Sequence, residues 1–465
     1  MAYNKRDSIS NSSIVYKVAL EPDYGELIMT ADAEAKFQKF KIAESSISYS
    51  QNAVESELFG GTRSPSKSAK GNVEVSGNIK VGIDNNQFGF WAYALLGKYT
   101  QTDEAGKKKH SFTISKDNIP SIQLEKSYSG TPLTYRTTGV KVNSMSVEFG
   151  GEGELYATLE VIGRNEFFYP YRVNAKEVKL SQIENQGANM LHLVSVDGIN
   201  EKDTITIKKQ ITTIAKADRG DTSISVVAAT DISKNDYITI EGVGAYQVKA
   251  VSGNVVYLSR GLEKAVTATA NVYLTTEIFV VKEVKKTEKA IVIDGTIDKG
   301  LKATDSVILD DKVSKMLYGT SFEQFEVSIS SSKNSNITAT AEKATFTLNN
   351  NTEGKRLIVD KGSFGKIVEG KVSATLEMDL IMDPENAMIL ENSKNDTIFD
   401  ITLTAVNKDG ESVSFIFPKG TITPKSPTAE SPGAVSLSVT YSPFEDNSEA
   451  VEIVLKNNKA ERYDA

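Results

Sequence analysis

The sequence of 465 residues contains no cysteine and only two histidines. The lack of cysteine excludes disulfide scaffolds, cysteine-based zinc sites and thiol catalysis. His110 and His192 are too few for a multi-histidine metal site, and His110 lies in the basic stretch "GKKKH", which we interpret as a solvated turn. Carboxylate pairs lie in polar turns without an aromatic cleft, and no phosphate-binding fingerprint occurs. We therefore expect no enzymatic activity, no cofactor and no metal.

Long hydrophobic runs are also missing from the sequence. The first residues lead into no apolar segment of signal-peptide length, and no later run approaches the length of a membrane span. We expect a chain that is made in the cytoplasm and does not bind membranes. Its net charge of −8 argues against generic adhesion to nucleic acid, because such binding needs Lys and Arg to replace the counterions of the phosphates.

Strand-like patterning fills most of the chain. Apolar and polar residues alternate between turn clusters such as "NNNTEG" and "NKDG". Met145 and Val147 are apolar in one phase, whereas Val140 and Val142 are apolar in the opposite phase, which predicts a bulge or bend near Asn143. We predict a mainly β protein, and a chain of this length is expected to form about two to four domains.

The clearest helix signal is the stretch "NNQFGFWAYALLGKY". Asp84 or Asn85 can cap its start. Its apolar residues recur at helical spacing at Phe88, Trp91, Ala92 and Leu95. Such a stripe usually packs on a sheet, so we interpret it as a core-facing surface and not as a ligand site.

One long strand pattern occurs twice, at "GNVEVSGNIKVGID" and "GKVSATLEMDLIMD". A shift of 299 residues without gaps superposes the two stretches. The apolar positions Val73, Val75, Ile79, Val81 and Ile83 map onto Val372, Ala374, Met378, Leu380 and Met382. The same shift places "ISYSQN" on "FTLNNN", gives equal lengths to the loops 53–70 and 352–369, and puts a helix start at Asp383 and Pro384 after the second strand. We infer that the chain is internally duplicated.

A segment of different character separates the two halves. Residues 200–312 contain short strand patterns between Asp, Asn and Gly turns, which is typical of a small barrel or sandwich. We therefore divide the chain into a first domain at 1–199, an inserted β domain at 200–312 and a second domain at 313–465. An inserted domain with its own core is expected to project from the surface.

The first half contains a series of four stretches: "ESELFGGTRSPSKSAKGNVEVSGNIKV", an apolar helix ending in "LLGKY", "HSFT" with "IPSIQLEKSY", and "GVKVNSMSVEFGGEGELYATLEVIG". In these stretches the first half resembles the tail tube proteins of tailed bacteriophages. The second half is similar more loosely, through "FTLNNN", "EGKVSATLEMDL", "FDITLTA" and "VEIVLKN". The resemblance implies tandem tube-like β-sandwich or barrel domains, each with a flanking helix, whose inner sheets join around a ring. Simple tube proteins lack the middle insertion, which would then be an outward decoration.

The resemblance also implies an assembly and its partners. Two tube-like units in one chain would close a ring as a homotrimer with pseudo-sixfold symmetry, and rings would stack into a virion tail tube. The lumen would pass genomic DNA and tape-measure protein without specific binding, and the tube ends would meet tail terminator and distal tail or baseplate proteins. A trimeric baseplate hub is the alternative function, and a β-sandwich surface adhesin is a third, which the missing export signal disfavours.

Each long strand should then turn one face to the lumen and the other to the wall. We predict these lumen-facing residues: Glu74, Ser76, Asn78, Lys80, Ser373, Thr375, Glu377 and Asp379. We predict these residues to pack in the wall or against a helix: Val73, Val75, Ile79, Val81, Ile83, Phe88, Trp91, Leu95, Met378, Leu380 and Met382. An ordinary solvated sheet face shows the same alternation and stays open as the alternative. The two long loops, with Phe59, Arg63, Lys355 and Phe364, are longer than a hairpin needs and are predicted to contact an adjacent ring or subunit.

Overall fold

The structure is a computed structural model. It describes residues 14–25, 37–54, 68–104, 106–128, 134–150, 154–169, 176–234, 236–241, 243–262, 264–309, 315–317, 319–322, 326–331, 341–358, 362–395, 397–423, 425, 435–459 and 461–464. Most of these residues lie in strands, which confirms the mainly β prediction. The described residues contain two helices, α2 and α3. In the described part of the chain, no helix is long and apolar enough to cross a membrane.

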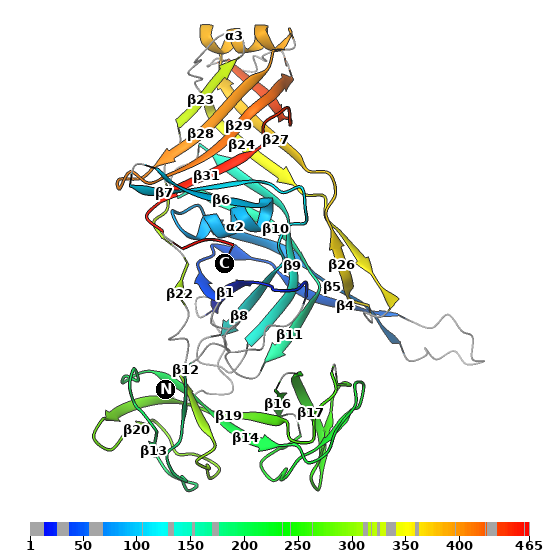
Figure 1. The fold of residues 1–465 in the computed structure, drawn as a ribbon, viewed down its shortest axis with the longest axis vertical. Helices are drawn as coiled ribbons and strands as arrows, with labels where there is room; N and C mark the ends of the chain where they lie inside the picture. Colours follow the sequence, from blue (N-terminus) through cyan, green and yellow to red (C-terminus); the bar gives the residue numbers. More distant parts are fainter. Residues whose placement is uncertain are drawn as a thin grey trace, which may run out of the picture.

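Three parts follow one another along the long axis of the molecule (Figure 1). We call residues 14–169 the first unit, residues 176–309 the insert and residues 326–457 the second unit. The first unit lies between the other two, and the strand pairs β4–β5 and β25–β26 extend from the body toward the same side (Figure 1). We call these extensions the first arm and the second arm.

The first unit is a two-sheet structure with one helix between sheet and hairpin. Its elements are β1 (Ile14–Leu20), β2 (Gln38–Phe40), β3 (Glu44–Ser45), β4 (Ser48–Val54), β5 (Ala69–Gly82), α2 (Gln87–Leu96), β6 (Gly97–Glu104), β7 (Lys107–Ile114), β8 (Ile122–Tyr128), β9 (Thr134–Phe149), β10 (Tyr156–Gly163) and β11 (Asn165–Tyr169). Strand β9 belongs to both sheets, because its first part pairs with β8 and β11 and its second part with β10.

The second unit repeats this plan. Its elements are β23 (Glu326–Ser331), β24 (Ala341–Asn349), β25 (Glu353–Arg356), β26 (Phe364–Val368), β27 (Ser373–Ile381), α3 (Pro384–Ser393), β28 (Phe399–Val406), β29 (Ser412–Thr423), β30 (Ser436–Pro443) and β31 (Glu452–Asn457). The pairs β23–β28, β28–β29, β29–β31, β29–β30, β27–β30 and β24–β27 correspond to β1–β8, β8–β9, β9–β11, β9–β10, β5–β10 and β4–β5. The short strand β22 (Lys315–Met316) leads into this unit and pairs with β2. The hairpin β6–β7 has no counterpart between α3 and β28 in the described residues.

Strand registers support the duplication more strongly than element order does. Tyr49 lies opposite Val75 in the first unit, and the positions 299 residues later, Leu348 and Ala374, lie opposite each other in the second. Irregularities are shared as well. The β8–β9 ladder shifts register just after Ile122, and the β28–β29 ladder shifts at the corresponding place after Phe399. Chance alternation does not reproduce a register irregularity at the same step of two ladders.

The expected helix forms at α2, but it is buried on more sides than the single apolar stripe predicts. Asp84 Oδ1 accepts hydrogen bonds from the backbone N–H groups of Asn86 and Gln87, so Asp84 holds the helix start although Asn86 is the N-cap residue. The helix is buried on nearly all sides, not along one stripe, because the hairpin β6–β7 and the C-terminal segment cover the face turned away from the sheet. Gly89 lies directly beneath the ring of Tyr463, where even a Cβ atom would collide.

The interpretation of His110 as a solvated turn is wrong. His110 lies in β7 and is fully buried. Its Nδ1 is 2.7 Å from the Tyr99 hydroxyl, and its Nε2 is 2.9 Å from Asn457 Oδ1. Burial is the main cause that lowers the pKa of His110. The histidine is a structural residue that ties the hairpin β6–β7 to the end of the second unit.

The insert holds two hydrophobic cores. Its strands are β12 (Lys176–Lys179), β13 (Met190–His192), β14 (Thr204–Thr212), β15 (Ser223–Ser225), β16 (Tyr237–Ile240), β17 (Gly244–Ser252), β18 (Val255–Leu258), β19 (Asn271–Lys285), β20 (Ala290–Ile293) and β21 (Ser306–Leu309). Because β12 pairs with β21 and β13 with β20, residues 176–199 pack with the insert and not with the first unit. We propose 176–309 as the inserted domain in place of the range 200–312.

The two cores of the insert are built alike. The bridge between Leu180 and Leu193 in one lobe has a counterpart between Thr213 and Val226 in the other. The long strands β14 and β19 pair with each other and run through both lobes. The second lobe, residues 211–274, is therefore nested inside the first and has its own core.

Candidate assembly surfaces

The two units are joined by strand pairing within the chain. Strand β9 of the first unit pairs with β24 of the second, from Phe149 opposite Ala344 to Ser144 opposite Asn349. The polar strands β4, β5, β10, β9, β24, β27 and β30 thus form one continuous sheet across both units. We call the β9–β24 pairing the in-chain seam.

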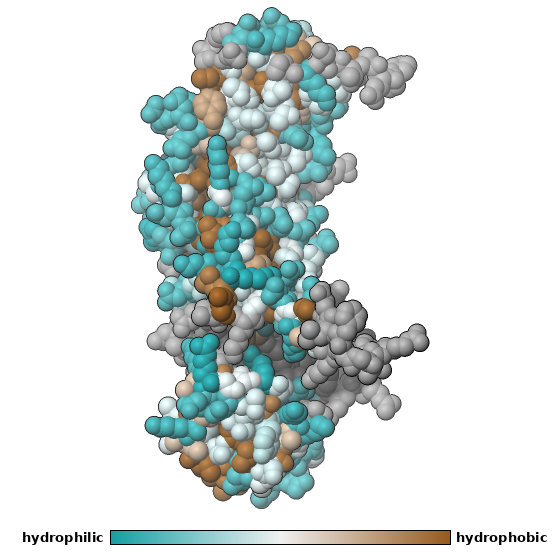
Figure 2. All heavy atoms as spheres, turned by 90° about the vertical axis from the view of Figure 1, so that its right-hand side faces the viewer, coloured by the Kyte–Doolittle hydropathy of each residue, from teal (hydrophilic) through white to brown (hydrophobic). Residues whose placement is uncertain are grey.

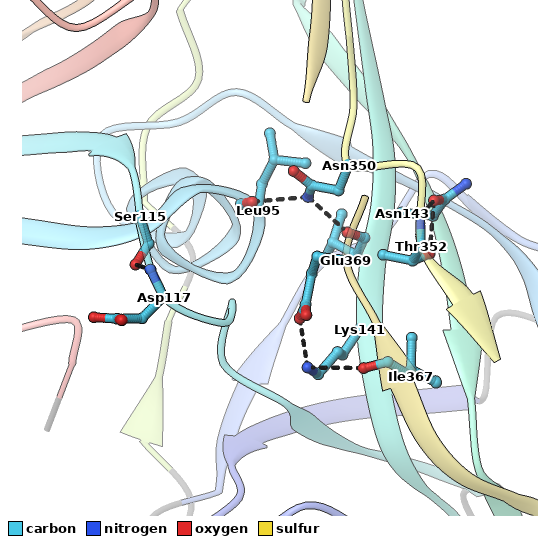
Figure 3. Close-up of polar contacts among 10 residues, drawn as sticks. Leu95, Ser115, Asp117, Lys141, Asn143, Asn350, Thr352, Ile367 and Glu369 are labelled. Carbon is cyan, nitrogen blue, oxygen red and sulfur yellow. Dashed lines mark hydrogen bonds and ion pairs between the residues drawn. The ribbon is translucent and has the colours of Figure 1, made fainter. Parts of the chain in front are cut away.

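A bulge in β9 anchors the end of this seam, as the change of apolar phase predicts. Ser144 and Val142 face neighbouring residues of β10, so Asn143 is the extra residue of the ladder. Asn143 Oδ1 accepts hydrogen bonds from the backbone N–H and the hydroxyl of Thr352, at 2.9 and 2.6 Å. The side chain of Asn350 donates to the carbonyls of Leu95 and Val142 (Figure 3). Asn350 is almost fully buried, so these bonds satisfy a polar group inside the seam.

A second contact between the units, which we include in the in-chain seam, joins β7 and β31. Strand β7 pairs with β31 in antiparallel register, and β31 also pairs with β29. Behind this pairing, the Tyr463 ring packs on Phe112 and His110, and Asn457 bridges to the backbone carbonyl of Asn85. The hairpin β6–β7 therefore covers an edge of the second unit that would otherwise be open.

The residues predicted to face a lumen lie on one face of the continuous sheet. Glu74, Ser76, Asn78, Ser373 and Glu377 are exposed, and Lys80, Thr375 and Asp379 are half-buried. The neighbouring strands add residues of the same kind at Thr158, Glu160, Ser144, Ser146, Glu148, Thr345, Thr347, Asn349, Ser438 and Thr440. We call this surface the polar face; its position in a lumen stays a prediction.

Carboxylates outnumber ammonium groups on the polar face. Lys343 lies on it and pairs with Glu148 at 2.9 Å. The hydrogen bond with Glu148, followed by the charges of Glu148 and Asp379, raises the pKa of Lys343. The sequence-based analysis did not place a cation near Asp379, because Lys343 is on another strand. Lys80 lies 5.0 Å from the ring centroid of Tyr156. The face is therefore net negative with local compensation.

The opposite face of the long strands is the hydrophobic core. The residues predicted to pack in the wall are buried at Val73, Val75, Ile79, Val81, Ile83, Phe88, Trp91, Leu95, Met378 and Leu380, and Met382 is partly buried against the same core. The alternation in β5 and β27 thus separates a packed face from a polar face along both strands.

Strand β4 ends the polar sheet at the other side of the first unit. Among the described residues, β4 pairs with β5 alone, and nearly all of its side chains are exposed. Tyr49 is 40% exposed, whereas its repeat counterpart Leu348 is fully buried under the in-chain seam. Ser46 N donates to Asn78 O, so by alternation the N–H groups of Ser48 and Ser50 point to β5 and that of Tyr49 points to the open edge.

The described ends of the predicted loop 53–70 belong to the first arm, and the described part of the loop 352–369 contains the second arm. Phe59 and Arg63 of the first arm lie outside the described residues. In the second arm, Lys355 pairs with Glu353, and the ring of Phe364 stacks on the guanidinium of Arg356 at 4.2 Å. Viewed from the side to which the arms point, the molecule is mostly hydrophilic with small hydrophobic groups (Figure 2).

The second arm docks on the first long strand of the same chain. Arg356 donates to the carbonyl of Val73 at 2.8 Å and pairs with Glu74 at 3.2 Å. At the base of the arm, Lys141 Nζ contacts the Glu369 carboxylate and the Ile367 carbonyl (Figure 3). Beyond these contacts the arm presents apolar side chains, and Ile358 is fully exposed.

Sequence reasoning missed Arg356, Asn350 and Lys343. Arg356 and Glu74 are 282 positions apart, and no local pattern connects them. The triplet "NNN" at 349–351 could have drawn attention to Asn350, because buried amides commonly satisfy backbone groups at irregular strand ends.

The comparison with protein families gives one match. Residues 10–168 match the sequence model of the family described as phage tail tube protein. The match covers the first unit, with its arm, helix and both sheets. The chain matches no curated protein. Residues 10–168 therefore form a domain of the phage tail tube protein family.

Proposed function

We propose that this protein is the tail tube subunit of a bacteriophage, and that three copies close a ring of six tube-like units. The match of residues 10–168 to the tube family supports a structural role in a phage tail. The second unit, which repeats the strand order and registers of the first, supports counting two tube-like units per chain. A ring of six such units then needs three chains, related by a cyclic axis.

The single observation that carries this proposal is the in-chain seam. Its β24 side, residues 344–349, corresponds by the repeat to residues 45–50 at the open edge of β4. The joint between subunits would repeat the pairing of the in-chain seam. In this joint, the open edge of β4 would pair with the end of β29 of a neighbouring subunit, as β24 pairs with β9 within the chain. Closing the ring this way pairs the open edge and leaves a barrel without free edges.

The polar face would line the lumen of this barrel. Ser, Thr and Asn side chains offer few fixed charges, and the excess of carboxylates repels phosphates, so DNA slides without binding. Tape-measure protein would occupy the same channel before DNA. Terminator and distal tail or baseplate proteins would meet the ring faces at the two tube ends, in a virion tail assembled in the host cytoplasm.

Negative-stain electron microscopy of the purified full chain tests the proposal. We expect hollow rings with three-fold symmetry that stack into tubes of unlimited length. Isolated trimers at every concentration would favour a baseplate hub, in which two tube-like units per chain also form a ring. Monomers at every concentration would contradict both assemblies.

A further inference from the structure

The proposed ring contains the in-chain seam and the joint between subunits, and the two differ in the hairpin β6–β7. At the in-chain seam, the hairpin β6–β7 of the first unit packs on α2 and pairs with β31 of the second unit. At the joint between subunits, α3 takes the place that α2 has in the in-chain seam, and β11 of the next subunit takes the place of β31. The second unit has no such hairpin between α3 and β28 in the described residues, so it has nothing of that kind to offer to β11.

The insert lies at this position. Strand β17 contacts β11 of the same chain, and in Figure 1 β17 lies beyond the end of β11 at the border between the first unit and the insert. The guanidinium of Arg260 is 4.8 Å from the ring centroid of Tyr246 in the insert and 5.9 Å from that of Phe167 in β11. Phe167 pairs with Arg136 of β9, just as Glu452 of β31 pairs with Ile416 of β29 in the second unit. The insert thus contacts β11 in the region where β7 covers β31.

The charge of the same arginine also acts on Tyr49, at the open edge of β4. Burial raises the pKa of the Tyr49 hydroxyl, and the nearby charge of Arg260 opposes that rise. Tyr49 belongs to residues 45–50, which correspond to the β24 side of the in-chain seam. Together with the contact between β17 and β11, this charge effect places the insert on the side of the first unit at which a neighbouring subunit would join.

The helix α3 lacks the cover that α2 has. Met388 of α3 is 48% exposed, whereas its repeat counterpart Gly89 in α2 is covered by Tyr463. Ile398, after the helix, is also exposed. In α2 the corresponding surface is covered by the hairpin and by the C-terminal segment. The α3 side of the joint between subunits thus lacks the cover that α2 has.

We infer that the insert replaces the missing hairpin at the joint between subunits: it covers β11 of its own chain and docks on α3 of the neighbouring copy. This inference rests on the proposed trimeric ring. It makes the insert part of the ring wall, in contrast to the outward decoration expected from the sequence.

Cysteine cross-linking tests this contact in the full chain, which has no cysteine of its own. Ala250 on the exposed side of β17 and Met388 on α3 supply the pair Ala250→Cys and Met388→Cys. With a flexible bis-maleimide, we expect covalent dimers and trimers in assembled rings. The control pair, Ala250→Cys with Val406→Cys, uses an exposed residue at the far end of β28 and should give only monomer.

Charge substitutions give a second measurement. Met388→Asp should weaken trimer formation at least tenfold, and Val406→Asp should change it less than twofold, as measured by mass photometry. Intact rings in which the Ala250 and Met388 pair links no better than the control pair would overturn the inference while sparing the proposed function. Absence of rings from the unmodified chain would overturn both. If Met388→Asp prevents folding, the cross-linking result decides alone.

Discussion

Replacing Tyr49 by proline should break ring closure and leave the subunit folded. The N–H of Tyr49 points away from β5 to the open edge, so proline removes no bond of the β4–β5 ladder. Ser48, the residue before it, is in extended conformation, which proline tolerates in its predecessor. The change therefore acts on the joint between subunits.

The size of the effect follows from the in-chain seam. A tyrosine side chain buries roughly 200 Å² when fully covered, and Tyr49 is 40% exposed, so closure would bury roughly 80 Å² more, worth about 2 kcal/mol. The lost hydrogen bond contributes about 1 kcal/mol, and its orphaned acceptor costs at least about 1 kcal/mol more. We expect about 4 kcal/mol for each joint, which weakens association by roughly three powers of ten.

Sedimentation velocity and a thermal melt of the same sample measure both consequences. The variant should be a monomer at concentrations at which the unmodified chain is a trimer, with a melting temperature close to that of the unmodified chain. Ser50→Pro is the matched control, because its N–H points to β5 and its loss should lower the free energy of unfolding by about 1 to 3 kcal/mol. Trimers of normal stability from Tyr49→Pro would refute the assignment of β4 as the joining edge.

Three further changes test other surfaces. Ile358→Asp at the exposed end of the second arm should leave trimers intact and stop their stacking, seen as single rings instead of tubes by negative stain; normal tubes would show that this side chain makes no contact between rings. Replacement of Glu377 and Asp379 by Lys should leave tail morphology unchanged and slow DNA ejection, because each added cation binds phosphate; unimpaired ejection from normal tails would place these residues outside the lumen. Asp84→Asn should remove a pH dependence of stability, because burial raises the pKa of Asp84 to about 6 and so makes its ionised form costly. That cost is absent below about pH 4 and reaches about 3 kcal/mol above about pH 6, so the free energy of unfolding of the variant, relative to the unmodified chain, should rise by about 3 kcal/mol between pH 4 and pH 7 in urea unfolding. An equal difference at both pH values would refute the titration.

Local sequence patterns predicted the features that depend on neighbouring residues. The change of apolar phase between Val142 and Met145 gave the bulge at Asn143, because a bulge exchanges the two faces of a strand. Asp383 followed by Pro384 gave the start of α3, where the Asp383 side chain accepts from Asn386 N. Both signals act over a few residues, so the sequence contains them completely.

Features that depend on distant partners could not be predicted in this way. His110 looks solvated among lysines, yet its partner Asn457 is 347 residues away and removes it from water. The insert begins before residue 200, because β12 and β13 pair with strands more than 90 residues later. A short strand pattern in the sequence does not indicate which other strand it pairs with.

In the proposed ring, the asymmetry between the units would explain what duplication gains over a ring of six identical chains. With identical chains, every joint must use the same elements, so a hairpin that covers one joint must cover all of them. In this chain the hairpin β6–β7 pairs with β31 within the folded chain. At the other joint of the proposed ring, the side chains of Tyr49 and Met388 are exposed in the single chain. A subunit built this way would carry half of the joints within itself, and only the open joints would respond to concentration and to neighbouring rings.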